Sequence, residues 1–248
     1  MKSSSSSPLS EHPSGLFLHL PGFPGTEEWS AGFTTLAAGG TMDPVLPHLG
    51  WRGLPVFRPA QVHGRRVLKI TQRAGAESFR EEADGLATGR RGIVLAVASA
   101  DCVPLILFDP RARAGAVLHA GWRGTCRGIA REGVRILRNE WASSPRDLLA
   151  LIGPCIGPCC YQVGEEVVRA FRDAGIEGGG TLPIGGGPSY LDLPAANRRL
   201  LEDAGIPPRR IFEAGLCTRC RGDLFPSYRR EGARAGRILG FLGSSPAP

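Results

Sequence analysis

A chain of 248 residues can bury a sizeable core in one large domain or two small ones. Its hydrophobic share of 42% and charged share of 21% are those of an ordinary globular protein and argue against a disordered chain. No apolar run approaches membrane-spanning length, and the net charge of +7 comes mainly from arginines scattered along the chain, so we expect neither membrane nor nucleic-acid binding.

The chain contains seven cysteines, an odd number in a protein too large to need disulfide bonds for its stability. This usage indicates a reducing compartment, in which thiols serve as ligands, nucleophiles or packing groups. We therefore expect a cytoplasmic protein.

Residues 1–30 are rich in Ser, Pro and Gly and are predicted to form a tail and an irregular lead-in, followed by one domain over 31–248. Apolar runs predict strands in the first half of this domain. Asp109-Pro110 is a turn signal between the last two of them, so these two are expected to pair as a hairpin. The strands are predicted at 67–72, 93–99, 105–108 and 114–119.

The pattern becomes helical after Gly124. Apolar residues recur at spacings of three and four between Ile129 and Trp141, which predicts a helix with one buried face. Strands and helices alternate in the remainder, and this mixture favours a single α/β or α+β domain. The later elements are a strand at 148–153, a helix at 165–174, a glycine-rich loop at 178–187, a helix at 192–204, and strands at 211–214 and 237–242.

Two histidines and one cysteine lie beside glycine, beside proline or at the end of an apolar run. They are His63 in Gln61-Val62-His63-Gly64, Cys102 in Ser99-Ala100-Asp101-Cys102-Val103-Pro104, and His119 in His119-Ala120-Gly121-Trp122-Arg123-Gly124. A His-Cys-His set binds zinc and leaves its fourth position open for water or substrate. The hairpin would bring Cys102 and His119 together, whereas His63 must come from a separate segment, and spacing alone does not show that all three meet.

An anion site is predicted next to these ligands. His119 leads into the start of a predicted helix, where free N–H groups and the helix dipole favour negative charge. Arg123 adds a planar guanidinium suited to phosphate or carboxylate. A metal site beside an anion site favours catalysis over packing.

The chain resembles the laccase-domain family, also called the polyphenol oxidase YfiH-type proteins, over most of residues 31–243. The resemblance is carried by many short blocks in one order. Besides the three segments above, they are Ala83-Asp84-Gly85, Gly153-Pro154-Cys155-Ile156-Gly157-Pro158-Cys159-Cys160-Tyr161, Leu191-Asp192-Leu193, Ala196-Asn197, Leu216-Cys217-Thr218, Ser227-Tyr228-Arg229-Arg230 and Gly236-Arg237.

This resemblance implies an α/β/β/α layered fold with zinc, rather than copper, bound by His63, Cys102 and His119. It also implies phosphorolysis of adenosine, inosine and methylthioadenosine, and deamination of adenosine. Purine nucleosides and phosphate are then the expected partners, with Arg123 holding phosphate. Asp84 is a candidate acid, base or ribose contact, and Gln61 is assigned to the substrate site. The oligomeric state is not predicted.

Two alternatives remain open. Cys102 and His119 could serve as nucleophile and base of a hydrolase that acts on a peptidoglycan precursor. Leu36 stands where relatives usually carry an arginine, and the segment between Gly40 and Gln61 is short, which leaves room for a metal-binding relative with weakened catalysis. Oxidation by several copper ions is not favoured, because the chain has five histidines and three of them lie near its front.

Four further cysteines are grouped as Cys159-Cys160 and Cys217-x-x-Cys220. Four thiolates are an accepted set for structural zinc. Adjacent cysteines are too close for the usual chelating spacing, however, and we favour packing or redox-neutral thiols. The Arg229-Arg230 pair could contact a second anion, although surface ion pairing is the favoured interpretation.

Overall fold

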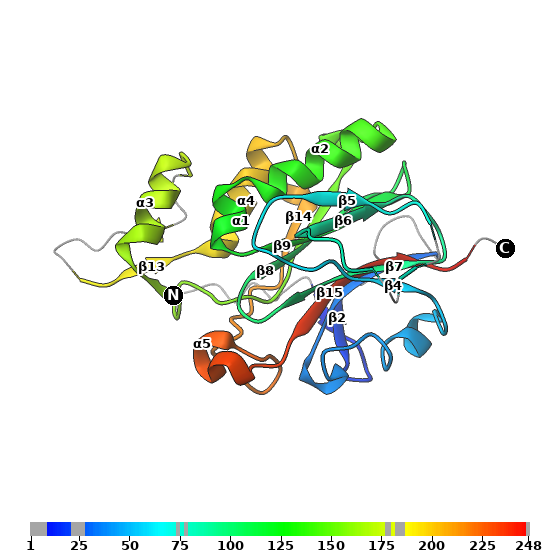
Figure 1. Cartoon of the computed structure of the whole chain (residues 1–248), viewed down its shortest axis with the longest axis horizontal. Coiled ribbons are helices and arrows are strands. Elements are labelled where there is room, and N and C mark those ends of the chain that lie inside the picture. Colours follow the sequence, from blue (N-terminus) through cyan, green and yellow to red (C-terminus); the bar gives the residue numbers. More distant parts are fainter. Residues whose placement is uncertain are drawn as a thin grey trace.

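Two six-stranded sheets form the centre of the molecule (Figure 1). This computed structural model describes residues 9–20, 28–72, 75–76, 79–176, 180–181 and 187–246. The first sheet has the order β1-β2-β3-β15-β7-β4. Strand β15 lies between β3 and β7 and is antiparallel to both. The strands of this sheet are β1 (Ser10–Glu11), β2 (Phe17–His19), β3 (Trp29–Thr34), β4 (Val56–Phe57), β7 (Val94–Ser99) and β15 (Ile238–Ser244).

The second sheet has the order β14-β10-β8-β9-β6-β5. The predicted hairpin is confirmed as β8 and β9, which pair antiparallel with Pro104 opposite His119. This register places the position before β8 close to the end of β9. The strands of this sheet are β5 (Val67–Lys69), β6 (Gly85–Thr88), β8 (Val103–Asp109), β9 (Ala114–Ala120), β10 (Leu149–Ile152) and β14 (Ile211–Glu213).

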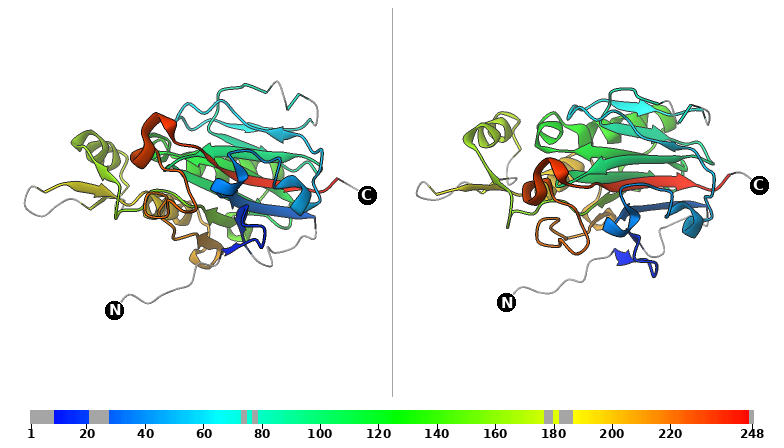
Figure 2. Two further views of the ribbon diagram at one scale, coloured as in Figure 1. Left: turned by 90° about the horizontal axis from the view of Figure 1, so that it is seen from below. Right: turned by 60° about the horizontal axis from the view of Figure 1, so that its bottom comes forward.

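Helices cover the outer face of the second sheet, with α2 and α4 above β8, β9 and β10 (Figure 1). Helix α3 stands to one side with a small sheet of order β11-β13-β12 (Figure 2). The helices are α1 (Trp122–Cys126), α2 (Ile129–Trp141), α3 (Glu165–Asp173), α4 (Leu193–Asp203) and α5 (Tyr228–Glu231), and the small sheet contains β11 (Gln162–Val163), β12 (Gly180–Thr181) and β13 (Ser189–Leu191). The 3-10 turns are η1 (Leu36–Ala38), η2 (Leu46–Leu49), η3 (Pro145–Asp147), η4 (Pro208–Arg210) and η5 (Gly232–Arg234).

Alternate side chains of β8 belong to different cores. Leu105 and Leu107 pack beneath the helices, whereas Ile106 and Phe108 pack between the two sheets. A strand whose two faces are both buried is apolar along its whole length. This explains why a continuous run of apolar residues predicts this strand from the sequence. A third cluster, containing Trp51, covers the outside of the first sheet.

The α/β/β/α layering is confirmed, but 3-10 turns η1 and η2 cover the first sheet in place of α-helices. The segment that contains η2 carries Pro44 and Pro47 and the positive-φ residues Gly50 and Gly53, which do not suit a regular helix. No helix among the described residues is long and apolar enough to cross a membrane.

The predicted irregular lead-in is partly wrong. Strands β1 and β2 extend the first sheet at its edge, and β3 begins at Trp29. Strands β1 and β2 are short and are flanked by Gly, Pro and Ser, so the sequence shows no strand pattern for them. Residues 1–8 and 21–27, and most of the predicted glycine-rich loop at 178–187, lie outside the described residues.

Candidate metal and substrate site

His63, Cys102 and His119 meet at one end of the second sheet. One ligand atom from each lies within 4.8 Å of the others. Cys102 stands just before β8 and His119 near the end of β9, so the hairpin brings these two together as expected. His63 comes from the loop before β5, and its ring lies against that of His119 with the centroids 4.9 Å apart.

A buried carboxylate organises the two histidines. Asp84 has no solvent exposure. Its Oδ1 lies 2.8 Å from Nδ1 of His119 and accepts the backbone N–H of His63 at 3.0 Å, while Oδ2 accepts the N–H of Gly64 at 2.6 Å. With Nδ1 so engaged, Nε2 of His119 is left for a metal, which is the usual arrangement around a histidine ligand.

This position revises the role expected for Asp84. Its carboxylate lies beneath the site and its acceptors are taken by His119 and by backbone N–H groups, so it is not placed to touch a substrate. Burial would raise the pKa of Asp84, but these hydrogen bonds outweigh burial and lower it. Asp84 is therefore a charged positioning residue.

The backbone on both sides of the site is held in the left-handed region. His63 has φ 57° and Asp101 has φ 87°, values that are uncommon for residues other than glycine. The Asp101 carboxylate accepts the Thr218 hydroxyl at 2.6 Å and the Arg229 backbone N–H at 2.7 Å, which fixes the residue next to Cys102. Such strained positions persist where the surroundings hold them and are common at functional sites.

Charge favours metal binding at the trio. Burial would raise the pKa of Cys102, but hydrogen bonds with His119 and His63 lower it to about 6. Burial would lower the pKa of His119, but hydrogen bonds with Asp84 and Cys102 raise it to about 9. The thiolate form of Cys102 is the form that binds metal, and a metal would replace the proton held by His119. A thiolate with two imidazoles fits the donor set of a catalytic zinc site.

The trio lies at a pocket of about 670 Å³. Aromatic side chains and arginines from separate segments form its walls. The Arg123 guanidinium lies 4.3 Å from the Trp122 ring centroid, and that of Arg229 lies 5.3 Å from the Tyr161 ring centroid. The lining residues are Gln61, His63, Ala98, Ser99, Ala100, Asp101, Cys102, His119, Trp122, Arg123, Ile156, Tyr161, Tyr228, Arg229 and Arg237.

Gln61 lines this pocket, but its amide is engaged by the protein. Nε2 donates to the carbonyl of Ala98 at 2.8 Å, and Oε1 accepts the N–H of Ala98 at 2.7 Å. This pair of bonds ties the loop that carries His63 to β7. Gln61 therefore braces the site, while Arg123 lies on the pocket wall.

The expected anion site at a helix start needs correction. Helix α1 has only five residues, Trp122–Cys126, so it supplies little dipole. Positive charge in the pocket comes instead from the side chains of Arg123, Arg229 and Arg237. Sequence reasoning gave no role to Arg237 or Tyr161, although both lie within the family blocks.

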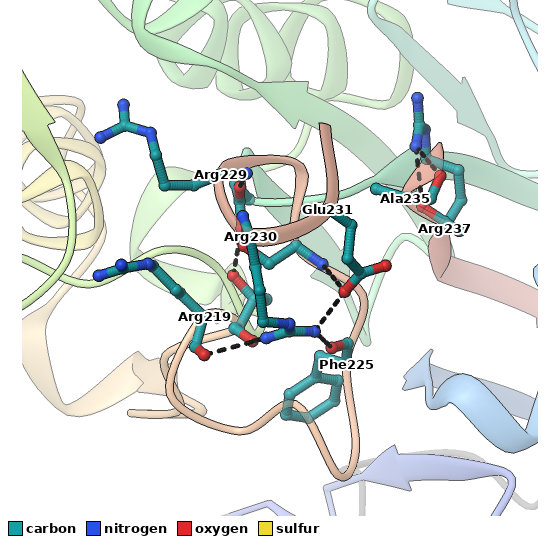
Figure 3. A network of polar contacts seen from close by, with 11 residues as sticks. Arg219, Phe225, Arg229, Arg230, Glu231, Ala235 and Arg237 are labelled. Carbon is teal, nitrogen blue, oxygen red and sulfur yellow. Dashed lines mark hydrogen bonds and ion pairs between the residues drawn. The ribbon is translucent and has the colours of Figure 1, made fainter. Parts of the chain in front are cut away.

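The Arg229-Arg230 pair serves two purposes. Arg229 lines the pocket, whereas Arg230, which also belongs to α5, directs its guanidinium toward the loop before that helix (Figure 3). Its guanidinium donates to the carbonyls of Thr218, Arg219 and Phe225. Surface ion pairing, the favoured interpretation, holds for Arg230, which pairs with Glu231, but not for Arg229, which lines the pocket.

The other three histidines lie elsewhere. The His12 ring is 5.4 Å from that of His48 and 6.0 Å from that of His19, at the edge of the first sheet. Among the described residues, these imidazoles do not form a group with metal-ligand spacing.

The chain is similar to known proteins in sequence and in structure. Residues 45–245 match the family model described as multi-copper polyphenol oxidoreductase laccase. The chain is 37% identical over 194 residues to "Purine nucleoside phosphorylase YlmD" of Bacillus subtilis, covering 75% of this chain and 70% of that protein. It is 40% identical over 189 residues to "Adenosine deaminase RL5" of an unknown prokaryotic organism, covering 73% and 72%. The crystal structure of Bacillus licheniformis hypothetical protein YfiH superposes with a TM-score of 0.87 at 31% identity, covering 96% and 99%.

Proposed function

The chain belongs to the multi-copper polyphenol oxidoreductase laccase family, and we propose that it is a zinc-dependent enzyme of purine nucleosides. The proposed reactions are phosphorolysis of adenosine, inosine and methylthioadenosine, and deamination of adenosine. One observation carries the proposal: His63, Cys102 and His119 lie together at a pocket whose walls combine aromatic rings with guanidinium groups. The names of the relatives, a phosphorylase and a deaminase, support it.

His63, Cys102 and His119 would hold the metal. When bound, zinc supplies a Lewis acid and lowers the pKa of bound water to about 7. Asp84 keeps Nε2 of His119 free by holding Nδ1, and the same carboxylate fixes the backbone of His63. Asp101, anchored by Thr218, presents Cys102 from the other side.

The pocket walls suit both proposed substrates, the purine nucleoside and phosphate. Trp122, Tyr161 and Tyr228 provide rings on which a purine can stack. Arg123 and Arg229 provide planar guanidinium groups that bind phosphate oxygens in pairs. Arg123 is exposed and lies over Trp122, so phosphate can reach it from solvent.

The donor atoms do not support a relay of several copper ions. Within the described residues, two groups have metal-ligand spacing, and only the His63, Cys102 and His119 group contains imidazoles. Multi-copper oxidation needs several histidine-rich sites. The family description therefore names a chemistry for which this chain offers too few histidine ligands.

The proposal is tested by incubating the zinc-loaded protein with adenosine, with and without phosphate, and separating the products by chromatography. Adenine that appears only with phosphate shows phosphorolysis, and inosine shows deamination. We expect Cys102→Ala to abolish both products and Cys126→Ala, outside the site, to leave them unchanged. An absence of product from the zinc-loaded protein, or equal turnover by Cys102→Ala, would contradict the proposal. Zinc binding without turnover would favour a relative with weakened catalysis.

A second candidate is a hydrolase that acts on a peptidoglycan precursor with Cys102 as nucleophile and His119 as base. The hydrogen bond between these side chains and the contact of His119 with Asp84 form a Cys-His-Asp arrangement. This candidate predicts activity that survives a chelator and ends on alkylation of Cys102. The zinc enzyme predicts loss of activity with the same chelator and recovery on adding zinc.

A further inference from the structure

Four cysteines outside the pocket converge on one point of the surface. Cys159 and Cys160 come from the loop between β10 and β11, and Cys217 and Cys220 come from the loop after β14. All four sulfur atoms lie within 4.8 Å of one another. Cys159 and Cys220 are exposed, so the packing role favoured from the sequence does not account for them.

We propose that Cys159, Cys160, Cys217 and Cys220 form a second metal site, which binds one zinc-like divalent cation through four thiolates and has a structural role. A tetrahedral site with zinc–sulfur bonds of about 2.3 Å separates its sulfur atoms by about 3.8 Å. Sγ of Cys220 lies 3.7 Å from Sγ of Cys159 and 3.4 Å from Sγ of Cys160. Small side-chain movements would therefore complete the tetrahedron.

Main-chain contacts join the two loops that carry the four cysteines. The N–H of Gly157 donates to Sγ of Cys217 at 3.3 Å. Cys155 and Cys217 form a parallel bridge, and the N–H of Thr218 donates to the carbonyl of Cys155 at 3.0 Å. The two loops are thus joined by the main chain next to the sulfur atoms, which explains how adjacent cysteines can act with a distant pair.

One guanidinium group contacts the cluster directly, and another holds the loop that carries two of its cysteines. Four thiolates and a divalent cation carry a net charge of −2, which is favourable where guanidinium groups lie close. The Arg219 side chain hydrogen-bonds to the sulfur of Cys160. Arg230 donates to the carbonyls of Thr218 at 3.0 Å and Arg219 at 2.9 Å, and so holds the loop that contains Cys217 and Cys220 (Figure 3).

A disulfide is the main alternative use of these thiols. A sulfur–sulfur bond measures about 2.05 Å, and the separations of 3.4 and 3.7 Å leave all four cysteines free. One disulfide needs only two cysteines, whereas four cysteines converge here. It matches the ligand count of a closed, structural zinc site.

The second site would support the first through Thr218. This residue follows Cys217 directly and donates its hydroxyl to Asp101, the neighbour of Cys102. A metal in the four-cysteine cluster would hold Thr218 in place without contacting the pocket. The cluster is therefore expected to act on stability and on the position of Asp101, and to take no part in proton transfer.

Metal content of the full chain, purified under reducing and anaerobic conditions, tests the proposal. We expect two zinc ions per chain in the wild type, one in His63→Ala, one in Cys217→Ser/Cys220→Ser, and two in the control Cys126→Ser. The result for His63→Ala separates this site from the proposed catalytic one. A variant Cys217→Ser/Cys220→Ser that retains the wild-type metal content would overturn the proposal.

Cobalt gives a second measurement that does not depend on the fold of the double variant. Cobalt-loaded His63→Ala should show the charge-transfer and ligand-field bands of a four-thiolate site, and a mercurial reagent that blocks thiols should release one equivalent of metal from it. A spectrum without sulfur-to-cobalt bands, or mass spectra showing disulfides under these conditions, would reject a metal site here.

Discussion

Nδ1 of His119 lies 2.8 Å from Oδ1 of Asp84, and this carboxylate is completely buried. The same residue also accepts the backbone N–H groups of Val62, His63 and Gly64. One carboxylate therefore sets the ring orientation of one proposed ligand and the backbone of another. Its removal should disturb the metal site from beneath while leaving the pocket wall intact.

Replacement of Asp84 by asparagine tests this role. The amide group would place donor hydrogens against donor N–H groups and would no longer hold charge next to His119. We expect the zinc affinity of the His63, Cys102 and His119 site to fall about 10- to 100-fold, as is typical when the partner of a histidine ligand is lost. Competition with a chromophoric chelator measures this change.

The matched control is Asp203→Asn, which alters a partly exposed carboxylate paired with Arg131 and Arg199. It should leave zinc affinity unchanged. Thermal unfolding of both variants checks that the fold is retained. Equal zinc affinity for Asp84→Asn and wild type would show that the buried contact does not position the ligand.

Gly121 lies against two of the proposed ligands. A Cβ atom at this position would stand 2.9 Å from Sγ of Cys102 and 3.1 Å from Cδ2 of His63. Its φ of −72° suits any residue, so the obstacle is steric. We expect Gly121→Ala to displace a ligand and to lower turnover about 100-fold, the order expected for a misplacement of about 1 Å.

Gly236→Ala provides the comparison for this substitution. Its nearest new contact would be Pro226 at 3.7 Å, an ordinary separation. Circular dichroism should show both variants folded, and metal content should fall only in Gly121→Ala. Wild-type turnover by Gly121→Ala would show that catalysis does not depend on the observed positions of Cys102 and His63.

Arg123→Gln separates the two proposed reactions. Phosphorolysis needs phosphate, whereas deamination needs water. Loss of a charged hydrogen bond should raise the KM for phosphate roughly 10- to 100-fold and leave deamination of adenosine unchanged. Steady-state kinetics with phosphate as the varied substrate measure the effect, with Arg131→Gln on α2 as control. An unchanged KM would assign phosphate to Arg229 or Arg237.

The cysteine pKa values predict selective alkylation of metal-stripped protein. The pKa of Cys102 is lowered to about 6, so its reactive thiolate forms above this pH and is lost as pH falls below it. Burial raises the pKa of Cys126 to about 11, which keeps this thiol protonated at neutral pH. Peptide mass spectrometry after iodoacetamide treatment should show half-maximal labelling of Cys102 near pH 6.

Zinc should protect Cys102 in the same experiment, since a ligating thiolate is no longer free to react. Labelling of Cys102 that rises only near the ordinary thiol pKa would show that His119 and His63 do not stabilise its thiolate. Labelling that is unaffected by zinc would remove Cys102 from the ligand set.

The elements found from the sequence are those with a continuous apolar pattern. Strands β7, β8 and β9 are buried along nearly their whole length, and α2 has one apolar face, so each left a clear signal. Strand β6, which reads Gly-Leu-Ala-Thr, is short and weak in β-formers and was not predicted. Periodicity also identified β15 as a strand without indicating that it lies mid-sheet.

The sequence predicts the part of the site that a single hairpin brings together. The β8–β9 turn brings Cys102 to His119, and the family resemblance supplied His63. The sequence presents Asp84 as a candidate acid, base or ribose contact, because it does not reveal that this carboxylate is buried under the ligands. The four-cysteine cluster joins positions about sixty residues apart, and the parallel pairing of β10 with β14, continued by the bridge between Cys155 and Cys217, explains that approach.

The middle position of β15 has a consequence for the order of assembly. Strands β3 and β7 have no direct pairing in the first sheet, since both bind β15, which ends at Ser244. During synthesis the hairpin β8–β9 can form early from local contacts, but the first sheet cannot close until residue 244 has left the ribosome. Nascent chains halted before β15 should therefore expose the part of β8 and β9 that β15 covers in the folded protein, and depend on chaperones to stay unaggregated.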